Sequence, residues 1–261
     1  MILIRGAGDI ASGIAVRLYR CGFTLAMTDL EKPTSIRRTV CFSEAILHGA
    51  YTVEGITAER ATTSEEAKAI WQRGHISVFA DDAGTTLPLL QPDALVDARL
   101  AKVNLDTSLS DAPIVIAVGP GFTAGTDCHA VVETQRGHYL GRAIYAGSAA
   151  PNTGVPGNIG GYTVERIIRA PKAGIFHPLR TIGDQVAADE IVAYVDEEPV
   201  RCLIGGTLRG ILPEGAAVYA GMKSGDVDPR CQLGHCFCTS DKTLAVGGGV
   251  LEALLHFGYR E

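Results

Sequence analysis

The residues best suited to chemistry in this sequence are glycines and acids near its start. Gly6, Gly8 and Gly13 follow a short apolar run, and Asp9 comes directly after the second glycine. Glycines at such a turn let the backbone approach a phosphate, and the first amide groups of a following helix attract it. Asp29 lies 23 residues after Gly6, about where an acid reads the ribose hydroxyls of a nucleotide. We therefore expect these five residues to form a nucleotide site, although such turns also serve purely structural roles.

Basic side chains follow several of the expected strand ends. They are candidates for contacts with the anionic groups of the ligand, since guanidinium groups suit phosphates and carboxylates. The candidates are Arg37, Arg38, Arg99, Lys102, Arg136 and Arg142. A solvated turn with an ion pair would give the same pattern at Arg99 and Lys102.

Cysteines gather near the C-terminus. Cys231, His235, Cys236 and Cys238 lie within eight residues. Their spacing is not that of a structural zinc site and no second pair of ligands follows, so we expect no metal. Cys236 or Cys238 is a candidate catalytic thiol for redox or chalcogen chemistry, and ordinary buried cysteines are the alternative. Seven cysteines without regular spacing fit reduced thiols and a cytoplasmic location.

The composition excludes several classes of protein. A formal net charge of −6 and the lack of a dense basic stripe argue against a nucleic-acid partner. No apolar run approaches the roughly 18 residues that span a bilayer, so we expect no membrane partner. The N-terminus reads as a strand rather than as a signal peptide.

The elements that position these residues follow from the apolar pattern. A strand at residues 2–4, a helix marked by Ile10, Ile14 and Leu18, and a strand at 23–27 form a β-α-β unit. A capping pattern predicts a helix over about 64–73. Further strands are predicted at residues 76–80, 94–97, 113–118, 129–133 and 142–145. Strands alternating with helices indicate an α/β fold, a Rossmann-like and mainly parallel sheet over residues 1–161.

The remainder of the chain contains an internal repeat. The pattern G-x8-G-x2-V begins at Gly174 and again at Gly206, with short β-type runs between. Two such halves resemble the barrel-sandwich hybrid of biotinyl and lipoyl domains, which we assign to residues 162–230. No lysine lies at the hairpin between the halves, so neither covalent biotin nor lipoate is expected. Residues 231–261 are predicted to return a glycine-rich helix to the first domain.

Eight blocks of this sequence, taken in order, resemble one family: the accessory proteins of the selenium-dependent molybdenum hydroxylase system. The blocks are IRGAGDIASGIAVRL, MTDLEKPTSIRRTVCFSEAI, VDARLAK, VGPGFTAG, ETQRGHYLGRAI, NTGVPG, GMKSGDVDPR and SDKTLAVGGGVLEALL. The resemblance implies a maturation factor for such a hydroxylase, with the hydroxylase as partner and a Rossmann fold. It supplies no catalytic residue.

Combined with the glycine turn, the resemblance predicts NAD(P) or a molybdopterin nucleotide as the ligand. Two alternatives remain open at this point. One is an enzyme, either an NAD(P)-dependent oxidoreductase or a selenium-transfer catalyst that uses Cys236 or Cys238. The other is a non-catalytic scaffold for the hydroxylase. A homo-oligomer is plausible in each case.

Overall fold

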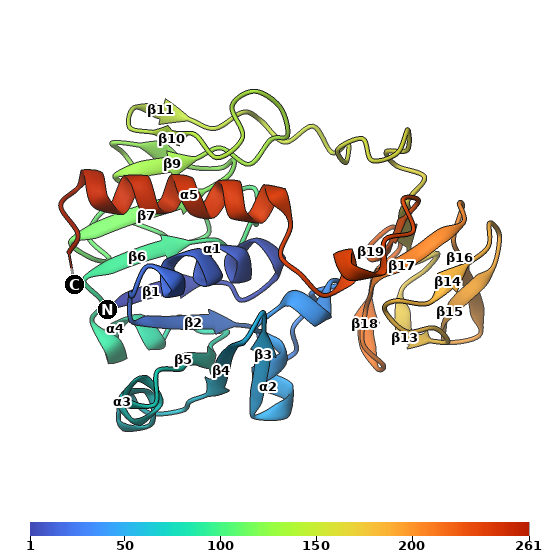
Figure 1. Cartoon of the computed structure of the whole chain (residues 1–261), viewed down its shortest axis with the longest axis horizontal. Coiled ribbons are helices and arrows are strands. Elements are labelled where there is room, and N and C mark those ends of the chain that lie inside the picture. The colour runs from blue at the N-terminus through green and yellow to red at the C-terminus, as the bar shows by residue number, and fades with distance from the viewer. Residues whose placement is uncertain (261) are drawn as a thin grey trace. The chain divides into compact units, whose positions relative to one another are not determined.

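The computed structural model describes residues 1–260, which form two compact units (Figure 1). Unit 1 contains Met1–Pro33, Cys41–Thr153 and the residues from Thr239 onward, and unit 2 contains Thr34–Val40 and Gly154–Cys238. The short segment Thr34–Val40 therefore packs with residues that lie much later in the sequence.

Unit 1 is built on a nine-stranded sheet in the order β10-β9-β7-β6-β1-β2-β5-β4-β3. The strands from β9 to β4 in this order run parallel, whereas β10 and β3 are antiparallel to their neighbours. The strands are β1 (Ile2–Arg5), β2 (Leu25–Asp29), β3 (Ala50–Val53), β4 (Ile56–Arg60), β5 (Ile76–Ala80), β6 (Ala94–Asp97), β7 (Ile114–Val118), β9 (Ala130–Val132) and β10 (Ala143–Ile144). A separate ribbon pairs β8 (Thr123–Ala124) with β11 (Gly147–Ser148).

The helices of unit 1 begin where the local sequence favours it. They are α1 (Asp9–Arg20), α2 (Glu44–His48), α3 (Ser64–Gln72), α4 (Thr86–Leu90) and α5 (Asp241–His256). At α3, Thr63 and Glu66 form the predicted capping box, in which each side chain accepts a hydrogen bond from the other residue's backbone N–H. The central strands β1, β6 and β7 are apolar and almost fully buried, as expected for strands covered on both faces.

The predicted Rossmann-like fold is wrong for this unit, although most neighbouring strands of the sheet do run parallel. The sheet is mixed, with an antiparallel strand at each edge. Within the described chain, no helix connects β6 to β7 or β7 to β9, so this half is not made of β-α-β units. Helix α5 packs there instead, against β7, β9 and β10. Apolar strand patterns alone did not reveal that these connections lack helices.

Helices α1 and α5 lie side by side and run in the same direction (Figure 1). A Cβ on Gly13 would lie only 2.3 Å from the Cβ of Thr243, and Gly247 lies against Ile14 and Arg17. The Arg17 guanidinium donates to the carbonyl of Leu244 over 3.1 Å. Gly13 is therefore required for close helix packing, and the two helices begin at the same end of unit 1.

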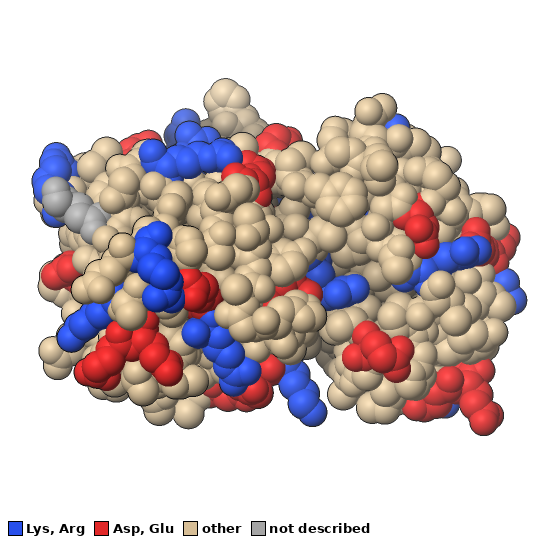
Figure 2. Space-filling model, turned by 60° about the horizontal axis from the view of Figure 1, so that its bottom comes forward, with Lys and Arg blue, Asp and Glu red and all other residues tan. Residues whose placement is uncertain are grey.

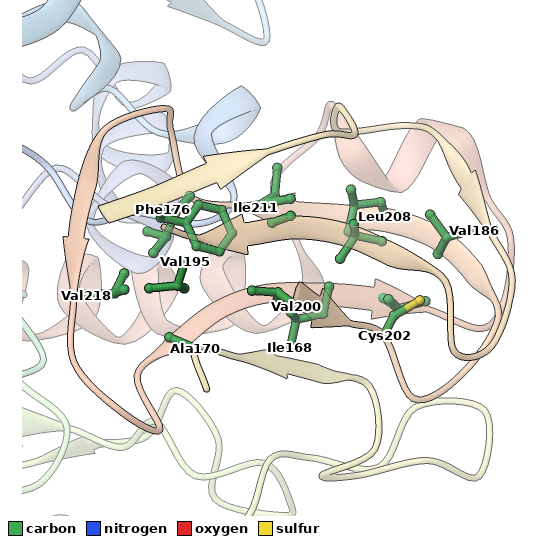
Figure 3. Packing of buried hydrophobic residues seen from close by; sticks show 14 of the residues in the cluster. Ile168, Ala170, Phe176, Val186, Val195, Val200, Cys202, Leu208, Ile211 and Val218 are labelled. Atoms are coloured by element: carbon green, nitrogen blue, oxygen red, sulfur yellow. The ribbon is translucent and has the colours of Figure 1, made fainter. Parts of the chain in front are cut away.

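Unit 2 consists of two four-stranded antiparallel sheets, in the orders β12-β19-β17-β14 and β16-β15-β13-β18. Their bounds are β12 (Ile167–Arg169), β13 (Gly174–Pro178), β14 (Gln185–Val186), β15 (Ile191–Val195), β16 (Glu198–Arg201), β17 (Gly206–Ile211), β18 (Ala216–Val218) and β19 (Lys223–Asp228). Two short 3-10 helices, η1 (Arg38–Val40) and η2 (Leu233–Cys236), belong to the same unit. Phe176, Val195, Leu208 and Ile211 are fully buried and point into the space between the sheets (Figure 3).

The prediction that this unit is a barrel-sandwich hybrid like biotinyl and lipoyl domains is not supported and is withdrawn. The repeat itself has a structural counterpart, because β13 and β17 begin at its first glycines, Gly174 and Gly206. These two strands belong to different sheets, and each pairs with the short strand that follows the other. The repeat therefore corresponds to equivalent strands in the two sheets, and it does not identify a family. Unit 2 also includes Thr34–Val40, outside the predicted range.

None of the helices among residues 1–260 combines the length and the apolar character that crossing a lipid bilayer requires. On the face drawn in Figure 2, positive and negative side chains are interspersed and form no continuous basic surface.

Candidate functional site

The glycine turn after β1 is held tightly by the residues around it. Gly6 has φ +100°, and a Cβ there would lie 2.9 Å from the carbonyl oxygen of Ala98, so glycine is required on both grounds. The carbonyl of Ala7 accepts hydrogen bonds from the Ser12 hydroxyl at 2.9 Å and the Ser43 N–H at 3.0 Å. The turn is thus a rigid platform that leads directly into α1.

Asp29, at the end of β2, is joined to this turn. Its Oδ2 accepts a hydrogen bond from the Ala7 N–H at 2.8 Å, and its Oδ1 accepts one from the Leu30 N–H at 2.8 Å. Burial raises the pKa of the carboxyl above its ordinary value, these two hydrogen bonds oppose the rise, and the negative Asp82 adds to it. Each carboxylate oxygen can accept about two hydrogen bonds, so each can still accept one from a ligand.

The surroundings of Asp29 are acidic. Asp82 accepts a hydrogen bond from the Glu31 N–H at 2.9 Å, which places both acids near the end of β2. The carboxylate of Glu31 is paired with Arg60 over 3.0 Å at each oxygen. A second anionic group next to Asp29 would therefore meet like charges.

The first turn of α1 starts at Gly8, which has an extended backbone conformation. Among the described residues, no side chain caps this helix end. The neighbouring α5 is different, because the Ser240 hydroxyl accepts a hydrogen bond from the Thr243 N–H at 3.3 Å. The uncapped start of α1 carries a partial positive charge, which favours an anion there.

Arg99 belongs to a dense polar network at the end of β6. Its guanidinium donates to Asp97 at 2.6 Å, to Asp106 at 2.6 Å and to the Thr107 hydroxyl at 3.1 Å. Burial acts to lower its pKa, but the hydrogen bonds to the two aspartates outweigh burial and raise it. Arg5 donates to the same Asp106 and Thr107, at 3.1 Å and 2.9 Å. These bonds hold the loop after β6 in place.

The prediction from sequence missed Arg5, Asp106 and Thr107. One signal was present: Arg5 is a charged residue at the end of an otherwise apolar strand, and it lies in register with Asp97. Lys102 lies in the same loop, exposed and with φ +67°, a conformation that few residues other than glycine adopt.

Arg136 and Arg142 lie in the loop between β9 and β10. Arg136 forms two hydrogen bonds of 2.8 Å with Asp241, the first residue of α5, and Arg142 lies 4.7 Å from the ring centre of Tyr139. The buried Glu133 accepts hydrogen bonds of 2.7 Å from the Gln135 and Ala150 N–H groups and so fixes both ends of this region.

The remaining candidates lie in unit 2. Arg37 donates to the carbonyls of His235 and Cys238 at 3.0 and 3.1 Å, and Arg38 donates to that of Ile211 at 3.1 Å. Both arginines belong to unit 2. Cys236 is buried and Cys238 is exposed. Among residues 1–260 no group of three potential ligands could hold a metal ion.

Unit 1 also has a surface hollow of about 590 Å³. It is lined by Pro92 and Asp93 before β6 and by Ala112 and Pro113 before β7. These residues lie at the amino ends of the strands, away from the glycine turn.

Comparison with known proteins gives no family. No family model matches this chain. A curated protein of Escherichia coli strain K12, "Uncharacterized protein YqeB", is 52% identical over 255 residues, which are 98% of this chain and 47% of that protein. This chain therefore spans about half the length of the curated relative it matches.

The similar solved structures are distant. An aspartoacylase family protein from Mesorhizobium loti is 12% identical with a TM-score of 0.28, over 87% of this chain and 84% of that one. A succinylglutamate desuccinylase/aspartoacylase from Rhodobacter sphaeroides is 13% identical with a TM-score of 0.27, over the same shares. At these TM-scores the two likenesses carry no argument about fold or activity.

These findings correct the expectation drawn from the eight sequence blocks. Neither the curated relative nor the similar solved structures are described as accessory proteins of a selenium-dependent molybdenum hydroxylase. The family, the maturation function and the hydroxylase partner are therefore withdrawn, together with the oxidoreductase, selenium-transfer and scaffold alternatives. The blocks include glycines such as Gly6, in a turn, and Gly13, inside α1, which backbone packing requires and which do not indicate a reaction.

Proposed function

We propose that unit 1 binds a nucleotide at the carboxyl end of β1 and β2. The observation that carries the proposal is the 2.8 Å hydrogen bond from the Ala7 N–H to Asp29. It joins an acid suited to ribose hydroxyls to the turn that leads into the uncapped start of α1. A phosphate would bind at Gly8 and the first amides of α1, and a ribose would donate to the free lone pairs of Asp29.

The acids around Asp29 favour a ribose without a 2′-phosphate. Asp82 lies beside it, and a phosphate at this position would meet two carboxylates, those of Asp29 and Asp82. Like charges brought together at a binding interface cost several kcal/mol. NAD+ is accordingly expected to bind at least about tenfold more tightly than NADP+. A molybdopterin nucleotide with free ribose hydroxyls is compatible with the same contacts.

The matched variants Gly8→Asp and Gly8→Asn test the phosphate position. Gly8 has φ −75°, which any residue adopts, and both Asp and Asn are good helix N-caps. Both variants should keep the stability of the protein, and only Asp adds a negative charge where the phosphate would bind.

The measurement is isothermal titration with NAD+, preceded by a thermal-shift screen of NAD+, NADP+, FAD, ATP and CTP. A ligand at about 100 times its Kd stabilises by about 2.7 kcal/mol, which the screen detects. Gly8→Asp should lose the ligand while Gly8→Asn retains most of the affinity. Equal affinity of wild type and Gly8→Asp, or no shift with any nucleotide, would refute the proposal. The cytoplasmic location expected from the cysteine pattern stays a prediction.

A further inference from the structure

Unit 2 contains a cluster of charged side chains on the sheet formed by β12, β17 and β19. The charged cluster, as we call it, consists of Arg166, Arg209, Asp226, Asp228, Arg230 and His235. Asp226 and Asp228 are two residues apart on β19 and so point to the same face of the sheet. Arg209 lies at a β-bulge of β17, between Leu208 and Gly210. Bulges re-aim side chains and are frequent next to functional sites.

The two carboxylates organise the cluster. Asp226 is hydrogen-bonded to Arg166, and its other oxygen lies 3.9 Å from the Nη1 of Arg209. Asp228 accepts two hydrogen bonds from the guanidinium of Arg230, at 2.9 and 2.6 Å, and one from its backbone N–H at 3.0 Å. Its Oδ2 lies 3.6 Å from the Nδ1 of His235.

These charges are deeply buried. Asp226 and Asp228 are 3% and 2% exposed, and Arg166 and Arg209 are each 8% exposed. Burial acts to raise the pKa of Asp228, but the hydrogen bonds from Arg230 and the charge of Arg209 lower it to about 2, so this carboxyl is ionised at neutral pH. The cluster therefore combines three guanidinium groups with two carboxylates, all within unit 2.

Two nitrogen atoms of the cluster form no hydrogen bond. The Nε of Arg166 is inaccessible to solvent and forms no hydrogen bond with any residue of the described chain. The Nδ1 of His235 is also buried and forms no hydrogen bond there, and the nearest carboxylate oxygen, on Asp228, is 3.6 Å away. Leaving a buried donor unsatisfied costs about 1–3 kcal/mol, and more for a charged group. Such groups in native proteins normally have a partner, often an ordered water or an ion.

We propose that the charged cluster of unit 2 binds a small oxyanion, of the phosphate type, that accepts a hydrogen bond from the Nε of Arg166. The anion would fill the missing acceptor position at this guanidinium, and charge-assisted bonds of this kind are the strong ones. The site is independent of the nucleotide proposal because all of its residues belong to unit 2. The same chemistry is offered by free phosphate and by the phosphate of a larger monoester.

The test is titration of the purified whole chain with inorganic phosphate and, separately, with glycerol 3-phosphate, at constant ionic strength set by chloride. Arg166→Lys keeps the charge and removes the Nε, and Arg169→Met, on β12 and exposed, is the matched control. Phosphate should bind wild type and Arg169→Met alike, and Arg166→Lys at least about tenfold more weakly. Tighter binding of the ester than of free phosphate would identify a larger ligand.

A second measurement keeps the proposal testable if Arg166→Lys does not fold. The Nε–Hε signal of Arg166 can be followed by NMR in the wild-type protein, since a buried N–H exchanges slowly with water. It should shift on addition of phosphate and not of chloride. An unmoved signal up to tens of millimolar phosphate, or equal phosphate affinity of wild type and Arg166→Lys, would overturn the assignment and leave a buried water as the partner of Arg166.

Discussion

Two neighbouring glycines of α5 should respond in opposite ways to the same substitution. A Cβ on Gly248 would meet nothing within 4 Å. A Cβ on Gly249 would lie 2.1 Å from the carbonyl oxygen of Gly141 and 2.8 Å from Cγ1 of Val132. Gly248→Ala and Gly249→Ala therefore differ only in what the new methyl group touches.

The expected magnitudes follow from these distances. Alanine is better than glycine inside a helix by about 0.8–1.0 kcal/mol, and Gly248→Ala should gain most of this. At Gly249 the backbone of Gly141 must retreat by about 1 Å to restore a contact of 3.0 Å. Overpacking of this kind costs about 1–3 kcal/mol, occasionally more, which exceeds the helix gain. The helix gain is common to both variants, so they should differ in stability by the overpacking cost, roughly 1–3 kcal/mol.

Urea unfolding followed by circular dichroism measures this difference, with wild type as the reference. The midpoint should rise for Gly248→Ala and fall for Gly249→Ala, with similar slopes. The reasoning rests on the position of α5 against the loop between β9 and β10. If Gly249→Ala were as stable as Gly248→Ala, the middle of α5 would not pack against Gly141, and the position of this helix on the sheet would be wrong.

Three further outcomes follow from the geometry. Glu133→Gln should lower the free energy of unfolding in urea by about 1–3 kcal/mol, because the amide NH2 replaces one of the two oxygens that accept from the Gln135 and Ala150 N–H groups. An unchanged urea midpoint would contradict this. The pKa of Asp228 is lowered from 3.8 to about 2, so its carboxylate contributes its full stabilisation above pH 3.8 and loses it as the pH falls toward 2. Asp228→Asn should therefore make the free energy of unfolding depend less on pH between these values, as followed by circular dichroism. Burial raises the pKa of Cys236, so maleimide should react with Cys238 before Cys236, as measured by mass spectrometry. Faster labelling of Cys236 would refute its burial.

The elements that could be predicted from the sequence have local signals. The capping residues Thr63 and Glu66 mark the start of α3, and the apolar runs at 76–80 and 94–97 are the strands β5 and β6. No local sequence pattern indicates that the described connections after β6 and β7 lack helices. The helix that packs on this part of the sheet, against β7, β9 and β10, is α5, which comes from the end of the chain.

Arg37 and Arg38 show which contacts a short stretch of sequence cannot indicate. They follow Asp29 by less than ten residues, which made them candidates for its ligand, and that role stays a prediction. Their guanidinium groups also donate to carbonyls of residues 211–238, and Thr34–Val40 belongs to unit 2. These partners come much later in the chain, so no local sequence pattern could have predicted them.

The sequence does not show which of the first glycines are needed for packing and which for binding a ligand. Gly6 is required by its positive φ and by the carbonyl of Ala98, and Gly13 by the side chain of Thr243. Both would be needed if no ligand bound at all. Gly8 is different, since its backbone conformation suits any residue and it begins a helix that no described side chain caps. The case for a nucleotide therefore depends on Gly8 and on Asp29, whose carboxylate oxygens can each accept a further hydrogen bond beyond those that hold the turn.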